Sequence, residues 1–174
     1  DEVLGFESLS GWSASAGTLA LSTDRVQGDF SLAVSNVGYT ELTSAAFSSV
    51  PGLAATGSLE LELPTSQPNP WWYGSVELRV DSPSRGVYSQ QIQHWELTGL
   101  PLGSCQELAF TVPSSLLTSL SAPGSADIRF IIALNVPSGS QVYRFDALTF
   151  GDSGGECNYS SSLGTNSKKV HLVY

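Results

Sequence analysis

The stretch SVELRVD, residues 75–81, alternates polar and apolar side chains without a break. Successive side chains of a β-strand point to opposite faces, so this alternation predicts a strand with one face on a core and one in water. Val76, Leu78 and Val80 form the expected core face. The expected outward face carries Ser75, Glu77, Arg79 and Asp81.

The same period of two recurs along residues 1–150 and decides the fold class. It is visible in Leu19–Leu21, Phe30–Val34, Leu59–Leu63 and Leu108–Val112. The segment Asp127–Val136 is more continuously apolar, as expected of a central strand, and only Pro113–Leu120 suits a helix. Glycine- and proline-rich breaks separate these segments. About ten strands spaced in this way predict an all-β protein, a two-sheet antiparallel β-sandwich of the jelly-roll type.

Charge and composition exclude some classes of partner. The chain of 174 residues has a net charge of −9, and both of its lysines lie after residue 150. Nucleic acid is an unsuitable partner because there is no cationic surface to displace counterions from phosphates. No stretch approaches the roughly 20 apolar residues of a membrane span.

The strand pattern stops at Phe150, which divides the chain into two parts. Residues 1–150 are expected to form the sandwich, and the Gly/Ser-rich residues 151–174 a linker or a remnant of an expression tag. Cys105 and Cys157 lack the close spacing of a metal site. One disulfide between them would imply an oxidising, extracellular compartment; two free thiols are the alternative.

Three catalytic patterns occur in part. Gly151–Gly155 reads GDSGG, as around the nucleophile of chymotrypsin-like proteases, but His94 lacks the context of the required base. Residues 77–79 and 91–94 faintly resemble two motifs of jelly-roll alginate lyases, whose third, tyrosine-bearing motif is missing. Glu60 and Glu62 share a strand face, as the carboxylates of a glycosidase could, but also as an ordinary solvated face does. We therefore expect no enzymatic activity.

The aromatic run Trp71-Trp72-Tyr73 stands between the proline-stiffened residues 67–70 and the strand at 75–81. If the strand extends back through this run, its parity sends Trp72 into the core. Trp71 and Tyr73 then join Glu77 and Arg79 on the outward face. Large rings beside hydrogen-bonding side chains suit the flat, polar-edged face of a sugar ring.

A second candidate surface lies in the strand expected at Tyr88–Leu97. Gln91, Gln93 and Trp95 share one parity, and glutamines offer both donors and acceptors to sugar hydroxyls. We expect this face to bind ligand, because Tyr88 and Ile92 on the other parity suit the core. Trp12 is assigned to packing.

Three segments in order resemble the calcium-stapled jelly-roll carbohydrate-binding modules appended to secreted bacterial polysaccharide-degrading enzymes. They are Gly5-Phe6-Glu7-Ser8 followed by Gly11-Trp12, then Gly28–Val34 (GDFSLAV), then Tyr143–Leu148 (YRFDAL). The resemblance spans residues 1–150. It implies a structural calcium held by Glu7, the carbonyl of Gly28 and Asp146, and carboxylate and carbonyl oxygens are the ligands that calcium requires.

The resulting hypothesis is a secreted, non-catalytic carbohydrate-binding module that holds an appended or partner enzyme near a polysaccharide. Its expected ligand is a polysaccharide or oligosaccharide, its expected cofactor structural calcium. A cell-surface adhesion or assembly sandwich that binds protein through its aromatic patch is the main alternative. A small jelly-roll glycosidase or polysaccharide lyase is a further one.

Overall fold

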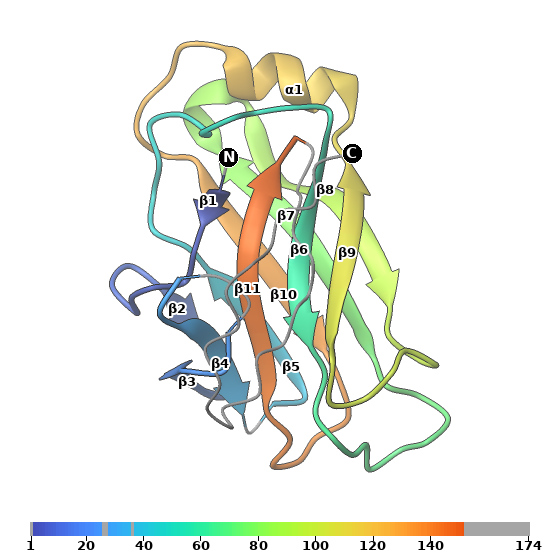
Figure 1. Cartoon of the computed structure of the whole chain (residues 1–174). Coiled ribbons are helices and arrows are strands. Elements are labelled where there is room, and N and C mark those ends of the chain that lie inside the picture. Colours follow the sequence, from blue (N-terminus) through green and yellow to red (C-terminus); the bar gives the residue numbers. More distant parts are fainter. Residues whose placement is uncertain (1, 26–27, 36, 152–174) are drawn as a thin grey trace, which may run out of the picture.

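The computed structural model describes residues 2–25, 28–35 and 37–151. Two antiparallel sheets face each other, and Figure 1 looks onto the first sheet with the second behind it. The first sheet comprises β1 (Glu2–Leu4), β3 (Thr18–Ser22), β4 (Ser31–Ser35), β6 (Thr56–Glu62), β9 (Cys105–Thr111) and β11 (Tyr143–Phe150). The second comprises β2 (Ser13–Ala14), β5 (Tyr39–Thr43), β7 (Ser75–Ser82), β8 (Val87–Glu96) and β10 (Arg129–Asn135).

The order of the strands confirms the predicted two-sheet β-sandwich. The first sheet runs β3-β4-β11-β6-β9, with β1 beside β11, and the second runs β2-β5-β10-β7-β8. The apolar segment β10 is central, as expected, between β5 and β7. The predicted helix is α1 (Ser114–Ser121), which lies across one end of the sandwich (Figure 1).

Strand alternation builds the core between the sheets. In β7, Val76, Leu78 and Val80 are completely buried while the residues between them remain partly exposed, which confirms the predicted faces. Each such burial contributes about 1.5–3 kcal/mol relative to an exposed side chain. Trp12, assigned to packing from the sequence, stacks on the buried Phe6 with ring centroids 5.1 Å apart.

Aromatic contacts join the two sheets near the end of the sandwich that α1 covers. Phe110 of β9 meets Phe150 of β11 edge-on, with ring centroids 5.4 Å apart. Phe150 in turn contacts Phe130 of β10, in the opposite sheet, at 6.0 Å. Such pairs contribute about 0.5–1.5 kcal/mol beyond the area that they bury. The contact fixes how the first sheet lies on the second.

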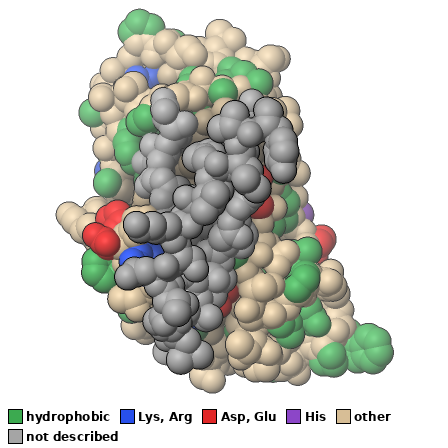
Figure 2. All heavy atoms as spheres, in the orientation of Figure 1, with side chains coloured by type: hydrophobic (Ala, Val, Ile, Leu, Met, Phe, Trp, Pro, Cys, Tyr) green, Lys and Arg blue, Asp and Glu red, His purple; other side chains and the backbone are tan. Residues whose placement is uncertain are grey.

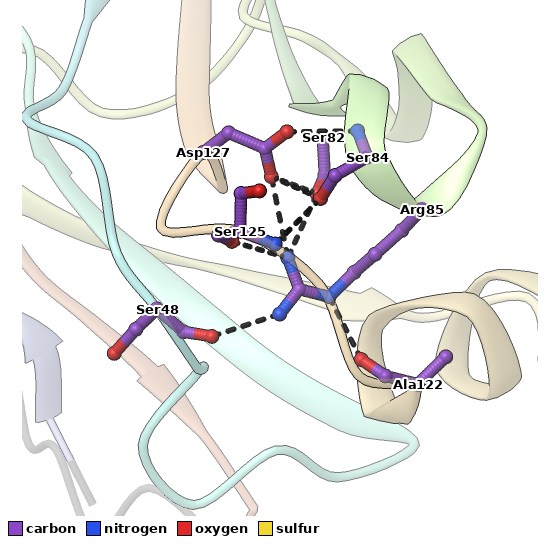
Figure 3. Close-up of polar contacts among 7 residues, drawn as sticks. All are labelled: Ser48, Ser82, Ser84, Arg85, Ala122, Ser125 and Asp127. Carbon is purple, nitrogen blue, oxygen red and sulfur yellow. Dashed lines mark hydrogen bonds and ion pairs between the residues drawn. The ribbon is translucent and has the colours of Figure 1, made fainter.

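A buried arginine ties together the loops at the end covered by α1 (Figure 3). Arg85, the last residue of the short 3₁₀ turn η1 (Pro83–Arg85), has only 3% of its side chain exposed. Its Nε donates to the carbonyl oxygen of Ala122 at 2.9 Å, and its Nη2 to that of Ser48 at 2.8 Å. Its Nη1 pairs with Asp127 Oδ1 at 3.2 Å. A planar guanidinium can serve these separate directions at once.

The carboxylate of Asp127 completes this cluster. It accepts hydrogen bonds from the Ser82 hydroxyl and the Ser84 backbone N–H, both at 2.7 Å. These bonds, the Ser82 hydroxyl first, lower the pKa of Asp127, and the charge of Arg85 acts in the same direction. A lowered folded-state pKa stabilises the fold above the unfolded-state pKa. That stabilisation is lost as pH falls through the folded-state pKa.

Within the described part of the chain, α1 falls short of the length and hydrophobicity that a membrane-spanning helix needs.

We expect Arg85→Lys to lower the free energy of unfolding by about 2 kcal/mol or more, because a lysine keeps the charge but cannot reach three diverging acceptors. Urea unfolding followed by tryptophan fluorescence measures the change. Arg129→Lys is the matched control, since Arg129 is exposed and makes one bond, to the Ser44 carbonyl oxygen. Equal unfolding midpoints for the two variants would show that the Arg85 cluster contributes no special stability.

Candidate functional site

A row of ionisable side chains crosses the outer face of the second sheet. Arg79 of β7 donates from Nη1 to Glu41 Oε1 of β5 at 3.0 Å, and from Nε to Glu77 Oε1 on its own strand. Glu77 also contacts His94 of β8, with 3.5 Å between its Oε2 and the histidine Nδ1. His94 Nε2 lies 2.9 Å from Glu96 Oε1. The five side chains come from β5, β7 and β8. They form one connected array that crosses the intervening strand β10.

Strand register brings these residues together. Ala133 of β10 pairs with Glu41 on one side and with Glu77 on the other, and His94 pairs with Glu77. Directly opposed residues share one face of a sheet, so all three charged side chains point outward. Ala133 itself is only 5% exposed. A small residue at this position allows the ion pairs to close over the central strand.

The array shifts the pKa of two side chains, His94 within it and Tyr39 at its end beside Glu41. The pKa of His94 is raised, chiefly by its hydrogen bond to Glu96 and then by that to Glu77, while partial burial opposes the shift. A neutral imidazole donates from one nitrogen only, whereas the charged ring donates from both. At the other end, the Tyr39 hydroxyl donates to Glu41 Oε1 at 2.8 Å. That bond raises the pKa of Tyr39, and its ring is half exposed.

The aromatic run lies in the loop before β7 and does not follow strand parity. Trp71 is 87% exposed and Trp72 is 37% exposed, so the prediction that Trp72 enters the core is wrong. Tyr73, predicted to point outward, is half buried and packs against the core. The physical reason is that β7 begins only at Ser75. Gly74 turns the chain with φ of 98°, so the alternation does not extend back into the loop.

The loop is fixed at the edge of the outer face. The N–H of Tyr73 donates to the Thr98 hydroxyl at 3.0 Å, and the N–H of Leu97 donates to the Gly74 carbonyl at 2.9 Å. Asn69 Oδ1 accepts from the N–H of Trp71 at 3.0 Å. These bonds place the loop that carries the exposed rings beside the end of β8 at Glu96. Figure 2 shows hydrophobic side chains projecting at the lower right, where Figure 1 places the β6–β7 loop.

A bulge in β8 divides the predicted glutamine face. Gln91 pairs with Arg79 and lies exposed on the outer side, whereas Gln93 pairs with Leu78, and a register shift separates the two pairs. A bulge inserts one residue into a strand and reverses the parity beyond it. The prediction that Gln91 and Gln93 share one face is therefore wrong. Ile92 at the bulge is buried, as predicted.

The other aromatic predictions in this strand are also corrected. Trp95 is half buried, donates from Nε1 to the Ala109 carbonyl at 2.9 Å and meets the ring of Phe110 edge-on. It pairs with Val76 on the core side, so it does not belong to the outer face. Tyr88, expected in the core, is instead 71% exposed.

Two of the three predicted calcium ligands, Glu7 and Gly28, lie side by side. The carboxylate of Glu7 lies against Gly28 and accepts N–H bonds from Asp29 at 2.9 Å and Phe30 at 3.2 Å. The Gly28 carbonyl accepts a bond from Arg25 Nε at 2.5 Å. The Glu7 carboxylate thus lies beside Gly28, while the Gly28 carbonyl is bonded to Arg25. Their oxygens are of the kind that calcium binds, although a cation at the Gly28 carbonyl would have to replace Arg25.

Asp146 lies on the outer side of β11 and lines a cavity with Arg25, the residue that bonds the Gly28 carbonyl. It is 4% exposed, and its Oδ1 accepts the N–H of Ala147 at 2.8 Å. It lines a small cavity with Arg25, Glu60 and Arg144, among others. Cys105 also lines this cavity and is disulfide-bonded. Its predicted partner Cys157, and the predicted tail from residue 152 onward, lie outside the described residues.

Sequence reasoning missed part of the array. It named Glu77 and Arg79 but not Tyr39 and Glu41, and it did not place His94 and Glu96 beside them. The stretch YTELT at 39–43 does alternate, with Thr40 and Leu42 buried, so β5 was open to prediction. That its outward residues meet those of β7 follows only from the strand order.

Comparison with known proteins identifies the fold. No protein-family model and no curated protein matches the chain. A solved structure of carbohydrate-binding modules from the β-sandwich superfamily aligns with a TM-score of 0.59 and 16% identity, over 85% of this chain and 60% of its own length. A CBM28 module specific for non-crystalline cellulose aligns with a TM-score of 0.56 and 14% identity, over 85% of this chain and 93% of its own length. TmCBM61 in complex with β-1,4-galactotriose aligns with a TM-score of 0.52 and 13% identity, over 85% of this chain and 96% of its own length. At these identities the likeness shows a shared β-sandwich fold.

We predict that His94 titrates above the ordinary histidine range and that Glu96→Gln lowers its pKa, because the main bond to the charged ring is weakened. Two-dimensional NMR of the imidazole protons against pH measures both values. His171→Asn assigns the signal of the other histidine. An unchanged His94 midpoint in the Glu96 variant would contradict the array in solution.

Proposed function

We propose that this protein is a non-catalytic carbohydrate-binding module whose ligand lies across the outer face of the second sheet. The observation that carries the proposal is the almost fully exposed indole of Trp71, on a hydrogen-bonded loop beside a row of oriented polar groups. An exposed tryptophan loses apolar hydration when a sugar ring stacks on it, and few rotamers have to be frozen. The charged row then offers hydrogen bonds to the hydroxyls of the chain.

The neighbouring folds support this class of ligand. TmCBM61 is in complex with β-1,4-galactotriose, and the CBM28 module is specific for non-crystalline cellulose. Both are sandwiches that the present chain covers over most of their length. Fold alone does not establish function, so the proposal depends on the residues of the face. We propose a polysaccharide as ligand, and binding measurements against a panel of polysaccharides would identify its sugar.

The arrangement of the carboxylates favours binding over turnover. Glycosidases place two carboxyl groups on either side of the bond that they cleave, one of them protonated. Here Glu41 and Glu77 are both ion-paired with Arg79, and Glu96 is bonded to His94. Carboxylates held by cations on an open sheet are suited to accept sugar hydroxyl bonds. We propose no catalytic role for them.

We further propose that the module acts outside the cell, tethered to a catalytic domain that degrades the same polysaccharide. The disulfide at Cys105 supports an oxidising compartment. Tethering raises the effective concentration of an enzyme at its substrate, so modest affinity per site is sufficient.

Trp71→Ala is expected to weaken polysaccharide binding at least tenfold, since one stacked ring contributes on the order of 1–3 kcal/mol. Isothermal calorimetry against galactan, xylan, mannan and cellulose oligosaccharides measures the effect. Tyr88→Ala is the matched control, because Tyr88 is also exposed, at the opposite end of β8. Equal affinity of the Trp71 variant and the wild type would refute the platform, and product release from the panel would refute a non-catalytic role.

The structural calcium remains a proposal, supported by the contact of Glu7 with Gly28. Calcium at 100 times its dissociation constant would stabilise the fold by about 2.7 kcal/mol and raise the melting temperature by several degrees relative to EDTA. Differential scanning calorimetry measures the shift, and Glu7→Gln should remove most of it. Glu107→Gln, an exposed acid on β9, is the control. Identical melting of the wild type in calcium and in EDTA would rule out this role.

A further inference from the structure

The outer face of the second sheet carries more acids than bases. Its described outward positions hold four carboxylates, those of Glu41, Glu77, Asp81 and Glu96. They hold two arginines and one histidine, Arg79, Arg129 and His94. The carboxylates therefore outnumber the cations even when His94 is charged. The aromatic loop before β7 adds no charge, because residues 67–74 contain none.

Arg79 and His94, the cations of the face that lie toward the aromatic loop, are already held in ion pairs. Arg79 is held by Glu41 and Glu77, and His94 lies between Glu77 and Glu96. Arg129 donates from Nη1 to the backbone carbonyl of Ser44 at 3.1 Å. Recognition of a ligand carboxylate normally uses an arginine fork or a lysine that is open to it. A uronic acid at Arg79 or His94, the cations on the side of the aromatic loop, would have to break an existing ion pair and would also meet the neighbouring carboxylates of Glu77 and Glu96.

A neutral sugar can bind to this face without breaking an ion pair. Each hydroxyl is both a donor and an acceptor, so it can donate to a carboxylate oxygen of the row without displacing Arg79. The Glu96 side chain is 67% exposed, and Glu96 pairs with Ser75, the residue that follows the aromatic loop, so such a bond is accessible there. Gln91, exposed on the same face, offers both a donor and an acceptor. The chemistry of the row therefore matches an uncharged, hydroxyl-rich chain.

We propose that this face selects neutral polysaccharides and rejects those that carry carboxylates, such as uronic-acid polymers. The inference builds on the proposed carbohydrate-binding function and gives it a ligand class. Like charges about 4 Å apart repel by about 1 kcal/mol in bulk water and by more near a protein surface. Repulsion by the surplus carboxylate and the loss of an existing ion pair are together expected to weaken binding of the charged ligand about tenfold at low salt.

The test compares two derivatives of one backbone. The neutral polysaccharide of the panel that binds best is substituted to the same degree with hydroxyethyl groups, which are neutral, or with carboxymethyl groups, which are charged. We expect the carboxymethyl derivative to bind about tenfold more weakly in calorimetry at 10 mM salt. The difference should shrink at 1 M salt, where the Debye length falls from about 30 Å to about 3 Å.

Variants that neutralise one carboxylate test whether the preference for the neutral derivative arises on this face. Glu96→Gln should narrow the difference between the two derivatives, because it removes one surplus carboxylate from the face. Glu107→Gln removes the same charge from the other sheet and should leave the difference unchanged. If both variants narrowed the difference in affinity equally, the effect would come from the net charge of the protein, and the proposal for this face would be overturned.

The possible failures are distinguishable. Equal or tighter binding of the carboxymethyl derivative overturns the selectivity while the carbohydrate-binding function stands. Absence of binding to every neutral and charged polysaccharide refutes the proposed function and the selectivity with it.

Discussion

The packing of two alternating sheet faces against each other is the interaction on which the rest of the structure depends. In β7 the buried Val76, Leu78 and Val80 leave every second position to the outer surface. Because side chains alternate strictly, a shift of the strand register by one residue would expose these apolar side chains and bury the charged ones. The hydrophobic free energy that stabilises the sandwich therefore also fixes Glu77 and Arg79 in position.

Loops are stabilised by different means at the two ends of the sandwich. At the end covered by α1, the buried Arg85 bonds to two segments that are distant from it in sequence, at Ser48 and at residues 122–127, which compensates for the cost of burying its charge. At the other end, backbone and side-chain bonds fix the aromatic loop while Trp71 remains exposed. An exposed ring on a fixed loop is poised to bind a ligand with little further ordering, which is the property that the proposed function requires.

Local rules failed where the backbone departs from regular strand geometry. The parity argument placed Trp72 in the core and Tyr73 outside, but the positive φ of Gly74 ends the alternation before the aromatic run. It likewise grouped Gln91 with Gln93, although the bulge at Ile92 separates them. Both errors arise because a sequence pattern carries the period of a strand but does not mark a turn or an inserted residue inside it.

The sequence by itself determined the all-β class, the inward and outward faces of β7 and the central position of β10, because hydrophobic periodicity is a local property. Only the tertiary structure decided that Glu41, 38 positions before Arg79, pairs with it across β10, and that His94 joins Glu77 to Glu96. Strand order and register depend on long-range pairing. The charge balance of the outer face, from which its ligand class is inferred, is therefore a property of the fold.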